Sequence, residues 1–163
     1  MTDQRHSFIG ARLALAGAVG LFAGLTGLAT DAQAQAHEVR QGDYVLRSST
    51  VASQSIAPET AAQHGIVPAP GRAVLNVVLL RPGNPSTAEA TVAAEVSASR
   101  QNLAGVQQTI AMREVRANGY ISYVGSYDFL PREVIDFTIT ARPAGAPPGQ
   151  AVTLNYRDRM ARR

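Results

Sequence analysis

Apolar and polar residues alternate along much of the chain after residue 36, and a period of two is typical of β-strands. The clearest stretch is 88–99, where alanine and valine occupy the even positions and mostly glutamate, threonine and serine occupy the odd ones. Residues 134–141 and 151–157 repeat this alternation. It predicts antiparallel strands that pack one face on a core and expose the other to water.

Two further strands are predicted in the first half of the chain. Residues 73–80 are apolar on both faces except for Asn76, which predicts a central strand covered on both sides. In such a strand Asn76 needs buried hydrogen-bond partners. Residues 42–49 alternate more weakly, and we expect a strand there as well.

The Asn118-Gly119 pair is the strongest turn signal in the chain. Both residue types adopt the positive φ angles of a two-residue hairpin turn, so the pair predicts a hairpin between strands at 106–115 and 120–127. Within 106–115 the apolar positions shift by one residue before Val115, which indicates a β-bulge.

One segment departs from the strand pattern. Pro58 suits the first position of a helix, Glu59 favours the positive end of the helix dipole, and Gly65 is placed to end the helix. We therefore expect a short helix over 58–64, inside an irregular stretch from 50 to 71. Seven strands, separated by glycine- and proline-containing turns, then predict an all-β, immunoglobulin-like sandwich of two antiparallel sheets.

The first thirty-six residues have the pattern of a secretory signal peptide. Two arginines precede an uncharged apolar run at 13–29, and small residues follow at alternate positions. We expect cleavage between Ala36 and His37, leaving a single domain of 37–163 in the periplasm without stable membrane insertion. A cut after Ala34 and an uncleaved membrane anchor are the alternatives.

Composition narrows the chemistry of the exported domain. The chain contains no cysteine, so it has neither disulfides nor a thiol nucleophile. Its net charge is +3, and the charges are dispersed except in an arginine-rich C-terminal tail at 157–163. The tail is either a solvated terminus or a contact for an acidic surface such as anionic lipid headgroups. Export and the lack of a basic–aromatic motif argue against nucleic-acid binding.

No catalytic pattern is present in the sequence. There is no Gly-x-Ser-x-Gly motif, no glycine-rich phosphate loop and no calcium loop. We therefore expect a protein that is not an enzyme and that has no cofactor.

One metal-binding hypothesis rests on His37 and His64, which are the two histidines of the exported domain. If cleavage follows Ala36, His37 becomes the amino terminus and binds copper through its amine and its ring. His64 then completes the site, because imidazoles suit copper. The alternative is that His64 caps the end of the predicted helix, where a partly charged imidazole is favoured.

The irregular segment 50–70 is the predicted interaction loop, because long loops on a rigid scaffold frequently carry function. Its candidate contact residues are Ile56, Pro58, Glu59, His64 and Ile66. The alternative is a covering loop that packs Ile56, Ile66 and Val67 over the open end of the core.

A series of short motifs resembles a known family through its order and spacing. The motifs are Gly42-Asp43-Tyr44, Ile56-Ala57-Pro58-Glu59, His64-Gly65-Ile66, Val74-Leu75-Asn76-Val77-Val78, Asn102-Leu103-Ala104-Gly105, Glu114-Val115, Tyr120-Ile121-Ser122-Tyr123-Val124 and Phe137-Thr138-Ile139. Residues 41–156 resemble the bacterial family called domain of unknown function 4426, which consists of small exported proteins. The resemblance implies a periplasmic β-sandwich without an established activity. Because its members usually carry an aromatic residue where His64 stands, it also counts against copper.

These observations predict a non-enzymatic periplasmic domain that binds an envelope protein or another envelope component. We expect exposed strand edges and the 50–70 loop to be its contact surfaces, with strand addition as one mode of binding. A copper-binding protein that uses His37 and His64 is the alternative, and a hydrolase is the third hypothesis.

Overall fold

The structure is a computed structural model that describes residues 36–81 and 90–160. The predicted signal peptide up to residue 35 and the last three residues of the arginine-rich tail lie outside the described residues. The strands are β1 (Ala36–Gln41), β2 (Tyr44–Ala52), β3 (Arg72–Arg81), β4 (Ala90–Thr91), β5 (Ala94–Asn102), β6 (Gln107–Ile110), β7 (Arg113–Ala117), β8 (Tyr120–Asp128), β9 (Val134–Pro143) and β10 (Val152–Arg159). The helical elements are α1 (Pro58–Gln63) and single 3₁₀ turns, η1 (Ser53–Ser55) and η2 (Pro148–Gln150).

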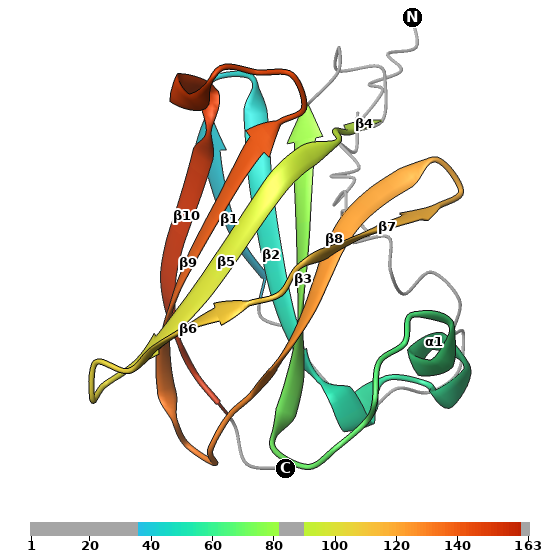
Figure 1. Ribbon diagram of the computed structural model, residues 1–163, viewed down its shortest axis with the longest axis vertical. Coiled ribbons are helices and arrows are strands. Elements are labelled where there is room, and N and C mark those ends of the chain that lie inside the picture. Colours follow the sequence, from blue (N-terminus) through green and yellow to red (C-terminus); the bar gives the residue numbers. More distant parts are fainter. Residues whose placement is uncertain (1–35, 82–89, 161–163) are drawn as a thin grey trace, which may run out of the picture.

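The strands form two antiparallel sheets that face each other as a sandwich (Figure 1). Sheet A has the order β1-β2-β3-β8-β7, with β4 pairing the end of β3. Sheet B has the order β10-β9-β5-β6. The predicted all-β sandwich of two antiparallel sheets with one short helix is therefore confirmed. Among the described residues, no helix is long and apolar enough to cross a membrane.

Two of the predicted strands are divided between the sheets. The strand predicted at 88–99 is β4 in sheet A and β5 in sheet B, and the one predicted at 106–115 is β6 in sheet B and β7 in sheet A. The predicted β-bulge is wrong, because the shift of apolar positions marks this change of sheet. Ile110 packs in the core between the sheets, whereas Val115 packs on the outer side of sheet A.

The first hairpin adds a strand that the sequence pattern did not predict. β1 pairs with β2 along its whole length, and the turn between them contains Gly42 at φ +56°. The expected strand at 42–49 therefore starts two residues later and continues to Ala52. With β1 and the two divided strands, the described residues form ten strands instead of seven.

Local turn and helix signals agree with the structure. Asn118 and Gly119 have φ angles of +51° and +78° in the β7–β8 hairpin. In the β5–β6 turn, the Asn102 side-chain oxygen accepts hydrogen bonds from the amides of Ala104 and Val106. The helix begins at Pro58 as predicted and is one residue shorter at its end.

Side chains from both sheets fill one core between them, with Leu46, Leu75, Ile135, Phe137 and Ile139 at most 1% exposed. β3 is also buried on its outer face, which confirms a central strand covered on both sides. Asn76 is buried in β3, but its Oδ1 accepts no hydrogen bond from the described residues. The predicted partners are thus missing at that atom.

Candidate functional site

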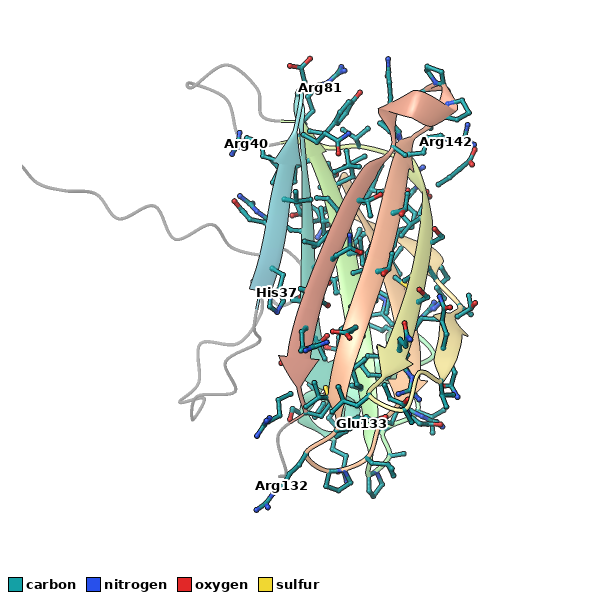
Figure 2. The ribbon with its side chains drawn as sticks, turned by 90° about the vertical axis from the view of Figure 1, so that its left-hand side faces the viewer. His37, Arg40, Arg81, Arg132, Glu133 and Arg142 are labelled. Atoms are coloured by element: carbon teal, nitrogen blue, oxygen red, sulfur yellow. The ribbon has the colours of Figure 1, made fainter. Side chains whose placement is uncertain are left out.

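His37 lies on β1 with its side chain turned toward the interior of the sandwich (Figure 2). Its ring stacks on that of Tyr156 from β10, with 3.8 Å between the ring centroids and an interplanar angle of 14°. The His37 Nε2 atom is buried and has no hydrogen-bond partner among the described residues. The imidazole therefore closes a gap between the edge strands of the two sheets.

The stack continues inward as a row of aromatic rings. Tyr156 stacks on Phe137 at 5.0 Å, and Phe137 meets the edge of the Tyr127 ring at 5.4 Å. The hydroxyl groups of Tyr156 and Ser48 share a hydrogen bond of 3.0 Å. Burial raises the pKa of Tyr127 and Tyr156, because their ionised forms would lose hydration. Stacked and edge-to-face aromatic pairs of this kind stabilise the folded core.

His64 lies at the end of α1, and α1 packs on the opposite side of sheet A from His37. The helix contributes Ala61 to an apolar cluster with Val74 and Val124 on the outer face of that sheet. His37 points into the space between the sheets. The predicted two-histidine copper site is therefore not formed, because sheet A separates the two side chains.

The predicted interaction loop is mainly a cover for sheet A. Ile56 and Ile66 are buried in the outer cluster, so neither is available to a partner. Ser53 ties the segment together, since its Oγ donates to the Ala69 carbonyl and accepts from the Ala69 amide. Val67 is 65% exposed and does not join the cover as the alternative had supposed. Of the remaining candidate residues, Pro58 and Glu59 are exposed and His64 is half-buried.

The centre of the outer face of sheet B, in contrast, is covered by no described helix or loop, and η2 lies only at one end of it (Figure 1). Six hydroxyl and amide side chains occupy its centre, and we call them the hydroxyl face. They are Ser97 and Ser99 on β5, Thr138 and Thr140 on β9, and Thr153 and Asn155 on β10. Cross-strand pairing arranges them as two rows, Ser97-Thr140-Thr153 and Ser99-Thr138-Asn155.

Two ion pairs border the hydroxyl face along the strands. At one end Arg142 contacts Glu95, and at the other end Arg157 donates to both carboxylate oxygens of Asp136, at 2.6 and 2.8 Å. The Arg157 hydrogen bonds hold the pKa of Asp136 below its usual value. Within the rows, the hydroxyls of Thr140 and Thr153 are 3.1 Å apart. The face thus offers many donors and acceptors with charges of both signs at its ends.

An open hollow of about 450 Å³ lies at the Arg142 end of this face. Its floor includes Ser97 and Thr140, and Pro148 in η2 lines its side. The rest of its lining is the Glu95–Arg142 pair and the apolar side chains of Val96 and Ala151. The hollow is wide open, unlike the enclosed pockets that bind small molecules. No group of three or more histidine or acidic side chains that could hold a metal occurs in 36–81 and 90–160.

The hydroxyl face was not among the sequence-predicted sites, although a signal for it existed. The alternation at 88–99, 134–141 and 151–157 predicts strands whose polar sides are exposed to water. Those sides carry mainly serine, threonine and asparagine, with the arginines, glutamate and aspartate only at the ends. The alternation does not show which sheet the 53–71 segment covers. In the structure this segment packs on sheet A.

Comparisons with known proteins place the chain in a family. The family model described as Domain of unknown function (DUF4426) matches residues 38–158. A DUF4426 family protein from Pseudomonas aeruginosa has a similar crystal structure, with a TM-score of 0.65, 25% sequence identity, and coverage of 77% of this chain and 94% of that chain. None of the curated proteins matches the chain significantly.

FetP from uropathogenic Escherichia coli, expressed in the periplasm, is also similar, with a TM-score of 0.54 and 14% identity over 77% of this chain and 93% of that one. A copper-bound FetP variant gives the same TM-score at 12% identity, over 77% and 89% of the two chains. At these identities FetP shares the fold alone. The chain belongs to the DUF4426 family, as the family model and the resemblance of its motifs both indicate.

Proposed function

We propose that this protein is an exported, non-enzymatic module that binds another protein of the bacterial envelope through its hydroxyl face. The observation that carries the proposal is the difference between the two outer faces. The 53–71 segment covers sheet A, while the centre of sheet B remains open. A sheet face that the chain leaves uncovered is available to a partner.

The chemistry of the face favours a protein partner. It is broad and hydrogen-bonding, whereas sites for small molecules are concave and mainly apolar. None of its six side chains is large and apolar, which suits a reversible contact more than an obligate one. The Arg142–Glu95 and Arg157–Asp136 pairs at its ends would orient a partner of complementary charge.

The periplasmic location rests on the N-terminal sequence. The charged start, the uncharged run at 13–29 and the small residues before His37 are what an export signal requires. The similar protein FetP was expressed in the periplasm, which agrees with export of this fold.

In vivo photo-crosslinking tests the proposed surface. A photoreactive amino acid placed at Thr138 or Asn155 should give a discrete crosslinked protein in the periplasm of the native bacterium. The same amino acid at Gln63, which is exposed on α1 behind sheet A, is the matched control and should give none. The combined substitution of Thr138→Arg and Asn155→Arg should weaken capture of the same partner by more than about tenfold, because two long cations would clash with it.

Equal crosslinking from Gln63 would contradict the proposal, and so would undiminished capture by the doubly substituted protein. Both changes lie on exposed positions, and thermal unfolding must confirm that the variants fold as the wild type does.

A further inference from the structure

One end of sheet B brings three chain segments together. Asn102 at the end of β5 pairs with Ile135 near the start of β9, and Arg159 at the end of β10 pairs with Val134. The β5–β6 turn, the β8–β9 turn and the C-terminal residues therefore leave the sandwich at the same end (Figure 1). We call this end the tip, and it comprises residues 103–106, 129–133 and 159–160.

The tip concentrates exposed apolar side chains. Leu103 is 70% exposed, Val106 54% and Leu130 71%, and they are three of the four large exposed hydrophobic residues in the described part of the chain. The fourth, Val67, follows α1 on the 53–71 segment. Large apolar side chains gathered at one exposed end point to a contact surface.

Cations accompany these side chains. Arg132 projects from the lower end of the molecule (Figure 2), and neither Arg132 nor Arg159 has an ion pair within the described residues. Most nearby carboxylates are engaged: Glu133 with Arg100 at 3.6 Å, and Asp136 with Arg157. Asp158 is the remaining acid, and its side chain accepts a hydrogen bond from the Arg159 amide. The sequence continues with two more arginines, at 162 and 163.

Hydrogen bonds hold both turns in shape. The Glu133 carboxylate accepts from the Leu130 amide at 2.8 Å, and the Arg132 amide donates to the Met160 carbonyl at 3.0 Å. Arg132 itself has a φ of +64°, a conformation uncommon for residues other than glycine. In the other turn the Asn102 carboxamide accepts from two amides. The apolar side chains are therefore presented by preformed turns, so binding need not order them first.

We infer that the tip docks on the surface of an anionic phospholipid bilayer. Leucine and valine on the turns would enter the boundary between headgroups and acyl chains, while Arg132 and Arg159 would contact lipid phosphates. The tip combines exposed apolar side chains with arginines that have no ion pair among the described residues. This combination matches a bilayer surface, where anionic headgroups lie above an apolar interior. The inference uses a different surface from the hydroxyl face and does not depend on the proposed function.

Vesicle flotation tests the inference with residues 37–163, which include both sheets and the core between them. The apolar run at 13–29 must be absent because it would itself bind lipid. The protein should float with vesicles of phosphatidylcholine and phosphatidylglycerol, and it should float little with phosphatidylcholine alone. Added salt should weaken binding by screening the charges.

Matched substitutions separate the tip from the rest of the surface. The pair Leu103→Ser and Leu130→Ser should weaken binding by about tenfold through lost apolar burial, and Arg132→Gln by about fivefold through a lost charge contact. Arg40→Gln is the control. Arg40 lies at the opposite end of the molecule (Figure 2), so this variant should bind as the wild type does.

Several results would overturn lipid docking. They are failure to float with the anionic vesicles, equal binding by the tip variants and the wild type, and loss of binding from Arg132→Gln without any loss from the leucine substitutions. The last result would mean that charge alone accounts for vesicle binding, without insertion of the apolar side chains. Thermal unfolding equal to that of the wild type would show that the variants remain folded.

Discussion

The hydroxyl of Tyr123 accepts a hydrogen bond of 2.6 Å from the backbone amide of Ala94. Ala94 is the first residue of β5, directly after the chain has left sheet A for sheet B. The same hydroxyl donates to the carboxylate of Glu114 at 3.1 Å, and Glu114 follows the return of the chain to sheet A. One side chain on β8 therefore links both places where a strand changes sheet.

Replacing Tyr123 by phenylalanine should destabilise the fold by about 1–3 kcal/mol, because the part-buried Ala94 amide and the Glu114 carboxylate both lose a partner. Chemical denaturation of the purified domain measures the change. Tyr120→Phe is the matched control on the same strand, since no hydrogen bond of its hydroxyl is found among the described residues, and it should change stability little. Equal effects of the two substitutions would contradict the role assigned to Tyr123.

Gly125 on β8 lies directly beneath the segment that joins β6 to β7. A Cβ atom there would approach the Ile110 Cγ2 at 2.7 Å, the Met112 Sδ at 2.6 Å and the backbone oxygen of Ala111 at 2.8 Å. Gly125→Ala should therefore cost about 1–3 kcal/mol, because the backbone oxygen has no freedom to move aside as a flexible side chain has.

Gly149→Ala is the control for this substitution, because nothing lies within 4 Å of a Cβ placed there. Urea denaturation of both variants provides the comparison. Equal stability of the two variants would contradict the close approach of residues 110–112 to Gly125.

Stability should fall at alkaline pH through the buried tyrosines. Burial raises the pKa of Tyr123, Tyr127 and Tyr156 in the folded state, while an unfolded tyrosine ionises near a pKa of about 10. Above that pH the unfolded chain loses protons that the folded chain keeps. The free energy of unfolding is therefore unaffected by these groups below pH of about 10 and decreases above it.

Tyrosinate absorbance followed together with unfolding tests this linkage. Three of the five tyrosines should ionise late and in step with loss of structure, and Tyr127→Phe should reduce the alkaline loss of stability. Early ionisation of all five tyrosines in the folded protein would exclude the linkage.

Copper binding gives a sharp test of the position of the two histidines. Because sheet A separates His37 from His64, His64→Ala should leave the copper affinity of residues 37–163 unchanged in a competition titration. A clear loss of affinity in that variant would mean that both imidazoles bind one ion, which the described fold does not allow.

Signals that depend on a few adjacent residues predicted the structure well. Asn118-Gly119 gave the hairpin because a two-residue turn needs positive φ at both positions, and Pro58 began the helix because its fixed φ suits a first turn. The candidate sites were predicted less well. Ile56 and Ile66 looked like loop contacts, but both are buried against sheet A, and no local pattern shows what a loop packs against.

Local sequence patterns were enough to identify this protein as an all-β member of its family, since period-two alternation and turn chemistry act over short distances. They also predict an export signal. The tertiary structure showed that the strand predicted at 88–99 changes sheet at Val92 and Ala93, because its alternation continues unbroken through the crossing. It also decided that the 53–71 segment covers sheet A and leaves Thr138 and Asn155 open on sheet B. Such choices depend on contacts between residues far apart in the chain, and these form only when the whole core packs.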